Sequence, residues 1–323
     1  MSTDLFRRRL IKGFACIGAG AAALPCCLSH ASYAAEAAAK FVLKEVADGV
    51  YAFGGVNEQM TDANQGAICN VGLVVGNEAA AAVDSGGSMV EARAFLAAIK
   101  DVTDKPVRYL VNTHMHPDHI FGNAAFRDIG ATIVGHRNLP RALAARGDFY
   151  LQSYRRQIGD ALMEGIEIVP PAQTVDDRLD LDLGGRKLEL RAWKAAHTDN
   201  DLTAYDPATR TFFAGDLVFM GHLPTLDGSL LGWMRQLDEL AAIDAAVTVP
   251  GHGPVPSAWP QALEDERRYF QVLAGDLRKA IADGVPLDEA VQTAGLGERG
   301  SWALFDDYNG RNATAAYAEL EWE

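Results

Sequence analysis

The stretch Thr113-His114-Met115-His116-Pro117-Asp118-His119 decides the fold of this chain. It places three of the eight histidines of the sequence, and one aspartate, within six residues. An apolar run at residues 107–112 precedes it and is expected to form a buried strand. Neutral imidazoles and carboxylates are the ligands that zinc and similar divalent metals prefer. The stretch therefore predicts a metal site at the end of a strand.

Three further residues of the same chemical types follow later apolar runs. His197 comes after residues 188–193, Asp216 after residues 211–214, and His252 after residues 247–249. Strand ends can gather at one edge of a sheet, so these side chains could converge on the first cluster. Their spacing alone leaves that convergence open.

Taken in order, these motifs resemble those of the metallo-β-lactamase superfamily, over about residues 40–256. The resemblance implies an α+β fold, a four-layer αββα sandwich that can hold two metal ions. It also implies a role for the turn at Asp84, which supports the histidine loop in that family. Carried over residue by residue, it gives His114, His116 and His197 as ligands of one metal, Asp118, His119 and His252 as ligands of the other, and Asp216 as the bridge between them.

The same resemblance implies a hydrolytic chemistry. Two Zn²⁺ ions, with iron or manganese as the alternatives, would lie about 3.5 Å apart and acidify a shared water to hydroxide. Asp118 is expected to be catalytic as well, orienting the hydroxide and accepting a proton. No serine or cysteine nucleophile is needed for this reaction.

Strands and helices alternate along both halves of the chain. We expect about ten strands and five to seven helices, arranged as two sheets with helices outside. Residues 41–323 are predicted to form one metallo-β-lactamase-like domain, and residues 258–323 a helical extension of it. Residues 35–40 (AEAAAK) are expected to be a short tether.

The first 34 residues predict export. Four basic residues within residues 7–12 precede an apolar run at 13–28, and small residues follow before Ala35, which is the layout of a signal peptide at residues 1–34. Residues 7–12 (RRRLIK) also resemble a twin-arginine signal, with an ordinary Sec signal as the alternative. The predicted location is the periplasm, with no membrane association after cleavage. Three of the four cysteines lie in this segment, and the remaining Cys69 is expected to be a buried structural thiol.

The net charge of the chain excludes some classes of binding partner. The net charge of −14 argues against a nucleic acid or an anionic membrane surface. A small-molecule substrate is expected instead. Within the superfamily, the chain is most similar to the exported sulfur-oxidation-type and quinoprotein relay system zinc metallohydrolases. The features behind that similarity are the signal, residues 64–66 (NQG), and residues 215–216 followed by 223–229 (LPTLDGS).

That subgroup implies a hydrolase acting on an ester, thioester or lactone-like substrate, linked to a periplasmic quinoprotein dehydrogenase system and a redox protein partner. Three alternatives stay open. A β-lactamase is disfavoured by Asp216, because zinc β-lactamases usually lack an aspartate at the bridging position. Mononuclear iron persulfide dioxygenases keep the motif. The third alternative is a non-catalytic metal-binding accessory protein, although such a protein could do with fewer ligands.

Several other residues have two readings. His222 could line the substrate pocket, whereas His136 is expected to be structural. Trp302, Phe305 and Tyr308 are expected to pack the last helices onto the core, with a place in the pocket wall as the alternative. Arg155-Arg156 is expected to be a solvated helix face or a contact for an anionic substrate.

Overall fold

Two β-sheets form the centre of the fold, and the computed structural model describes them within residues 41–323. The predictions for the signal peptide and for the tether at residues 35–40 lie outside the described residues. The first sheet contains seven strands in chain order: β1 (Lys44–Ala47), β2 (Val50–Phe53), β3 (Val71–Val75), β4 (Ala80–Val83), β5 (Val107–Val111), β6 (Thr132–His136) and β7 (Gln173–Val175). The strands are antiparallel from β1 to β4 and parallel from β4 to β7.

The second sheet has five strands in the spatial order β12-β11-β10-β9-β8. Their bounds are β8 (Arg178–Asp182), β9 (Lys187–Ala192), β10 (Leu202–Asp206), β11 (Thr211–Phe219) and β12 (Val247–His252). Neighbours are antiparallel except for β11 and β12, which run parallel. The carboxyl ends of β11 and β12 therefore lie at the same edge of this sheet.

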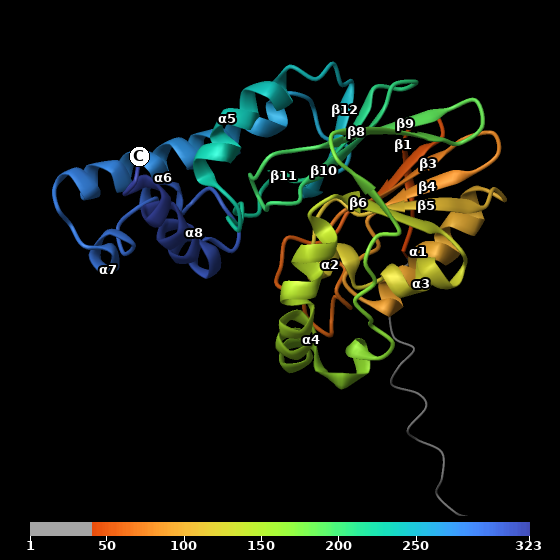
Figure 1. Cartoon of the computed structure of the whole chain (residues 1–323), viewed down its shortest axis with the longest axis horizontal. Helices are drawn as coiled ribbons and strands as arrows, with labels where there is room; N and C mark the ends of the chain where they lie inside the picture. The colour runs from red at the N-terminus through yellow and green to blue at the C-terminus, as the bar shows by residue number, and fades with distance from the viewer. Residues whose placement is uncertain (1–40) are drawn as a thin grey trace, which may run out of the picture. The chain divides into compact units, whose positions relative to one another are not determined.

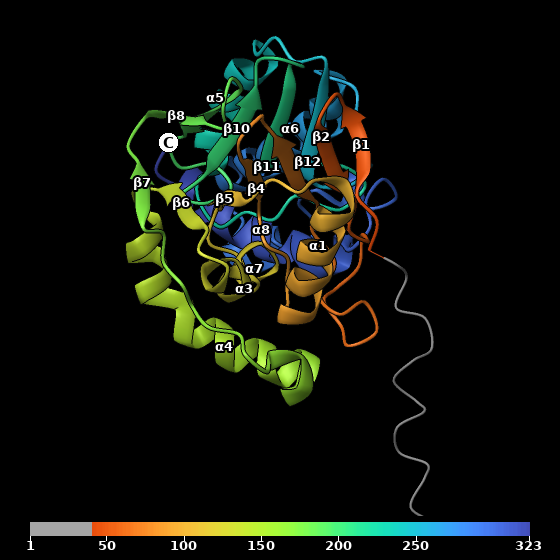
Figure 2. The ribbon, with the colours of Figure 1, turned by 90° about the vertical axis from the view of Figure 1, so that its right-hand side faces the viewer.

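The helices alternate with the strands along the chain, and the last three follow β12. In chain order, the helices are α1 (Met89–Val102), α2 (Pro117–Ile120), α3 (Asn123–Asp128), α4 (Leu139–Met163), α5 (Leu230–Ala241), α6 (Glu264–Ala282), α7 (Leu287–Ala290) and α8 (Phe305–Leu320). Figures 1 and 2 show α1 and α3 beside the first sheet, and α5 and α6 beside the second. No helix in residues 41–323 has the length and apolar character needed to span a membrane.

Three separate buried clusters give the fold its four layers. Along β4, Ala80 and Ala82 face the helices α1 and α3, whereas Ala81 and Val83 face the second sheet. The same alternation occurs on β11, where Phe213 lies between the sheets and its two neighbours face α5 and α6. This period of two is what a strand packed on both faces requires. The predicted αββα sandwich with C-terminal helices is confirmed.

Close packing between the sheets depends on one glycine. A Cβ atom at Gly72 of β3 would lie 2.2 Å from the ring of Phe213 on β11. The glycine thus leaves room for the phenylalanine ring between the layers. This contact helps to set the distance between the two sheets that carry the site.

The structure differs from the sequence expectations in a few elements. Twelve strands and eight α-helices are present within residues 41–323, more than the expected ten strands and five to seven helices. The short β7 and the single turn α2 are too brief to give a periodic signal. Helix α5 begins at Leu230, where the Ser229 side chain accepts a hydrogen bond from the Gly232 N–H and caps the helix. Helix α4 is interrupted at Gly159, whose φ is 81°.

Helix α6 buries a carboxyl group under the second sheet, which gives a prediction for stability. Glu266 is fully buried, and its nearest donor is the Phe219 backbone N–H at 3.4 Å. Burial therefore raises the pKa of Glu266 well above its usual value of 4.5. The folded protein keeps a proton on Glu266 that the unfolded chain releases above about pH 4.5. The free energy of unfolding therefore falls as pH rises above that value.

Glu266→Gln removes that dependence, because a neutral amide does not titrate. We expect the Tm of the variant to rise relative to the native protein between about pH 5 and pH 8. Thermal unfolding across this range checks it, with Glu264→Gln, an exposed position on the same helix turn, as the control. Parallel Tm curves for the native protein and Glu266→Gln would refute the assignment.

Candidate metal centre

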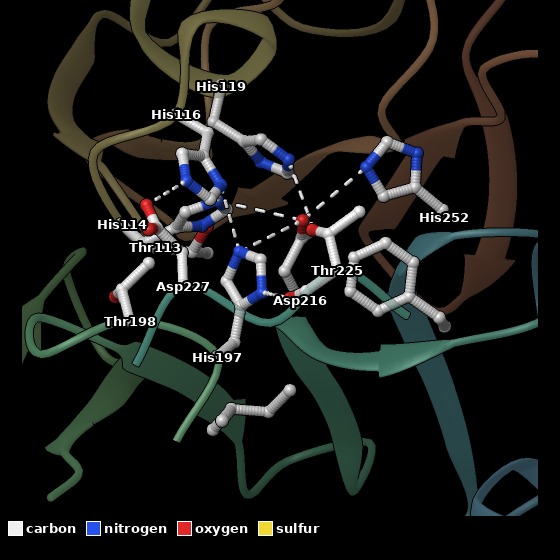
Figure 3. A network of polar contacts seen from close by, with 12 residues as sticks. Thr113, His114, His116, His119, His197, Thr198, Asp216, Thr225, Asp227 and His252 are labelled. Carbon is white, nitrogen blue, oxygen red and sulfur yellow. Dashed lines mark hydrogen bonds and ion pairs between the residues drawn. The ribbon is translucent and has the colours of Figure 1, made fainter. Parts of the chain in front are cut away.

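All seven predicted ligand residues meet at one edge of the two sheets. Figure 3 labels six of them, all but Asp118. They come from five places in the fold. His114 and His116 lie in the loop after β5, and Asp118 and His119 lie in α2. His197 lies in the loop after β9, while Asp216 and His252 belong to β11 and β12.

Four of these residues form a first group. The Nδ1 atom of His116 lies 3.1 Å from Nε2 of His114 and 2.9 Å from Nε2 of His197. The Oδ2 atom of Asp216 completes the group, 3.4 Å from His197 Nε2. All four ligand atoms lie within 4.8 Å of one another, which suits one small cation held between them.

The second group is built around the same carboxylate. Oδ1 of Asp216 lies 3.1 Å from Nε2 of His119, and its Oδ2 lies 3.5 Å from Nε2 of His252. Asp118 approaches both imidazoles with Oδ2, at 3.4 Å from His119 and 3.3 Å from His252. Asp216 is therefore the residue that the two groups share.

Each imidazole has its second ring nitrogen held by the protein. Acceptors of this kind fix the tautomer and the orientation of a metal-binding histidine. The contacts are Thr113 Oγ1 to His114 (3.0 Å), Asp227 Oδ2 to His116 (3.1 Å), Asp84 Oδ2 to His119 (2.8 Å), the Thr225 carbonyl to His197 (2.7 Å) and the Ile68 carbonyl to His252 (3.0 Å). The nitrogens that remain all face the centre.

Two buried polar atoms at the centre have no hydrogen-bond partner among the described residues. His119 Nε2 and Asp216 Oδ1 are buried and have no hydrogen-bond partner within residues 41–323, although they lie 3.1 Å apart. Unpaired buried polar atoms are costly. A divalent cation between them would use both as ligands. The donor set of five imidazoles and two carboxylates thus fits a dinuclear metal site.

The electrostatics of the centre also suit cations. Burial lowers the pKa of His114 well below its usual value and lowers that of His197 to about 3, so both are neutral. Burial has the same tendency at His252, but the carboxylates of Asp216 and Asp118 outweigh it and raise the pKa to about 9. A cation would replace the proton on such a histidine, so metal binding should release protons.

A known protein family matches the part of the chain that holds these residues. The sequence pattern of the Metallo-beta-lactamase superfamily matches residues 65–252, more than half of the chain and the whole ligand set. The chain belongs to the metallo-β-lactamase superfamily. Its match to that pattern begins before β3 and ends at His252.

Proteins similar in sequence to this chain are named for different activities. The linear primary-alkylsulfatase of Pseudomonas sp. (strain ATCC 19151) is 27% identical over 205 residues, which are 53% of this chain and 39% of the relative. The 2,4-dinitroanisole O-demethylase subunit alpha of Nocardioides sp. (strain JS1661) is 26% identical over 183 residues, 55% of this chain and 51% of the relative. The chain spans about half or less of the length of these relatives.

Solved structures support the fold. A metallo-beta-lactamase from Pontibacter korlensis aligns with a TM-score of 0.57 at 21% identity, over 71% of this chain and 98% of that protein. A double mutant of a sec-alkyl sulfatase aligns with a TM-score of 0.64 at 16% identity, over 85% of this chain and 49% of that protein. Identities this low indicate a shared metallo-β-lactamase fold only.

A pocket of about 430 Å³ opens onto the two ligand groups. His222 lies in its wall, and its ring stacks on His252 with centroids 5.0 Å apart. Tyr308 also lines it, whereas Trp302 and Phe305 are buried in the core. The two readings of the C-terminal aromatic group are therefore each correct for part of it.

Other candidates lie away from the pocket. His136 lines a separate surface hollow, in keeping with the expected structural role. Arg155 pairs with Asp160 on the exposed side of α4. Cys69 is buried, and its Sγ donates to the Asp118 carbonyl at 2.9 Å, which agrees with a structural thiol.

The sequence analysis named Asp84 as a support of the histidine loop but missed the roles of Asp227 and Thr225 behind His116 and His197. Asp227 and Thr225 lie in the loop between β11 and α5, where no strand end marks them. Asp227 accepts from His116 and also pairs with Arg146 of α4 and Arg311 of α8. An aspartate closely spaced after the bridging Asp216 was the one available signal.

Asp84 gives a prediction about metal affinity. Its carboxylate accepts from the Thr113 N–H and hydroxyl, both at 2.8 Å, and from His119 Nδ1. Asp84→Asn keeps the shape and tolerates the φ of 58° at this position, but loses the charge behind His119. Removing such a partner costs roughly 10- to 100-fold in metal affinity.

Competition with a chelator measures that affinity directly. Asp101→Asn, at an exposed site on α1, serves as the matched control and should leave it unchanged. Equal chelator midpoints for Asp84→Asn and the native protein would show that Asp84 does not support His119.

Proposed function

We propose that this chain is a dinuclear zinc metallohydrolase that cleaves an ester, thioester or lactone-like bond. The observation that carries the proposal is Asp216, whose two oxygens face both ligand groups at the floor of the pocket. Two bound zinc ions would supply an activated water at neutral pH and polarise the oxygen of the substrate bond.

The residues of the chain would position the reactants. Burial favours a neutral Asp118, but the imidazoles of His119 and His252 outweigh it and hold the pKa of that carboxyl well below its usual range. Asp118 is therefore an anion that lines the pocket and can accept a hydrogen bond from water. As the predicted catalytic residue, it would orient that water toward the substrate and take up its proton.

A panel of substrates tests this function. The zinc-loaded protein should hydrolyse 4-nitrophenyl acetate, a thioester or a lactone, and Asp118→Asn should lower kcat by at least about 100-fold. Turnover of a β-lactam alone would instead support the β-lactamase alternative. Oxygen consumption with a thiol persulfide would support the iron dioxygenase, and no turnover with two bound metals would support the accessory role.

Sulfate monoesters are the second candidate substrate. The specific observation is that two of the similar proteins are named as alkyl sulfatases, one by sequence and one by fold. Hydrolysis of 4-nitrophenyl sulfate in preference to the carboxylic esters would favour this candidate.

Export and a quinoprotein partner belong to the same proposal. The basic and apolar residues of positions 7–28 support export, and the similarity to the quinoprotein relay hydrolases supports a periplasmic redox partner. Replacing Arg7 and Arg8 with lysine should retain the protein in the cytoplasm if the twin-arginine route is used. Cell fractionation distinguishes this result from Sec export, which tolerates the change.

A further inference from the structure

Part of the pocket wall beside the metal ligands carries positive charge. Arg146 of α4 and Arg311 of α8 both line the pocket, and both approach Asp227. Two guanidinium groups thus face one carboxylate, which leaves one positive charge uncompensated. The other carboxylates of the pocket, Asp118 and Asp216, belong to the ligand groups.

Most donors of these arginines are available. Arg311 lies 3.5 Å from Asp227 and forms no hydrogen bond within residues 41–323, while its side chain is 53% exposed. Arg146 uses one nitrogen on Asp227. A guanidinium has five N–H donors in a planar fork that matches a carboxylate. The pair can therefore bind an anionic group without giving up Asp227.

A buried hydroxyl points to the same ligand. Tyr150 is 6% exposed and lines the pocket one helix turn after Arg146. Its hydroxyl lies beside the Arg146 guanidinium, which can only donate, so the O–H has no acceptor among the described residues. Residues four apart share one face of a helix. A buried hydroxyl donor beside two arginines suits an oxygen of an anionic ligand, because an unpaired buried polar group is costly.

The subsite adjoins the metal centre through a single side chain. Asp227 Oδ2 accepts from His116 Nε2 and pairs with Arg146 (Figure 3 shows Asp227 beside His116). A small substrate could thus reach both places at once. Helix α8 lies in the C-terminal extension, so the extension supplies Arg311 to the wall of the pocket.

We propose that Arg146, Arg311 and Tyr150 form an anion subsite that holds a carboxylate of the substrate, remote from the bond that is cut. This inference rests on the proposed hydrolase function. It narrows the substrate to a small ester, thioester or lactone that carries an acidic group.

Two matched esters test the subsite. 4-Nitrophenyl hydrogen succinate and 4-nitrophenyl acetate share a leaving group, but only the first has a remote carboxylate. The native protein should prefer the succinate ester in kcat/KM. Arg311→Gln should lower that preference roughly 10- to 100-fold, the range expected for hydrogen bonds to a charged group. Arg156→Gln, at an exposed position on α4 away from the pocket, is the control and should leave it unchanged.

Binding of succinate, measured by calorimetry on the metal-containing protein, supplies a readout that needs no turnover. Arg311→Gln should weaken it at least about tenfold, with Arg311→Lys in between. If neither ester is hydrolysed, the hydrolase proposal fails for these substrates, while succinate binding still decides the subsite. An unchanged preference for the succinate ester, or an unchanged affinity for succinate, in Arg311→Gln would overturn the proposed anion subsite. So would an Arg311 effect confined to 4-nitrophenyl sulfate, since the anion would then be the scissile group.

Discussion

Replacing Asp216 with Asn should cost the protein at least one bound metal and lower its turnover by more than about 100-fold. That is more than the loss of a residue behind a ligand produces. The reason is that Asp216 is shared by both ligand groups, with Oδ1 facing His119 and Oδ2 facing His197 and His252. An amide has one oxygen and no charge, so it cannot serve both groups. Metal analysis and steady-state kinetics on one preparation measure the two effects together.

The control for this variant is Asp176→Asn, an exposed aspartate outside the pocket. It should keep both the metal content and the rate of the native protein. If Asp216→Asn also keeps them, the shared carboxylate is not a bridge, and the two-metal assignment is wrong.

Gly251→Ala should have the second large effect, although the substitution adds one methyl group outside the ligand set. A Cβ atom at this position would lie 1.9 Å from Asp216 Oδ1 and 2.7 Å from the backbone of Gly215. Both the bridging carboxylate and the strand that carries it would have to move. Misplacement of such a group by about 1 Å can cost on the order of 100-fold in rate. We expect that loss in kcat, together with weaker metal binding.

Gly275→Ala on α6 is the matched control, because its Cβ would meet nothing within 4 Å. The control should stabilise the fold by about 0.5–1 kcal/mol, as alanine does in an exposed helix. A native rate and metal content in Gly251→Ala would show that Asp216 is not held against this strand.

The sequence pointed to residues that the fold brings together, because of how the site is built. His114 and His252 lie at strand ends that close packing of the sheets brings together, and strand ends are readable from apolar runs. The position of Asp216 was less readable. Strand β11 continues to Phe219, with a register shift at Gly215, so Asp216 lies within the strand rather than after it.

The two arginines of the pocket wall could not be predicted from the sequence. Arg146 and Arg311 are far apart in the chain, and each lies on a helix with many other charged residues. Only the packing of α4 and α8 on either side of Asp227 brings them into one pocket. Arg155 and Arg156 drew attention because they are adjacent in sequence, but they lie outside the pocket lining. Adjacency in sequence is thus a poorer guide to a binding wall than strand ends are to a metal site.

The metal content of the native protein tests the central claim most directly. Elemental analysis of the full-length protein, expressed in its native host and purified without added metal, should find two zinc ions per chain, and Asp216→Asn should hold fewer. One iron ion per chain, with oxygen consumed on a thiol persulfide, would contradict a dinuclear hydrolase built on Asp216.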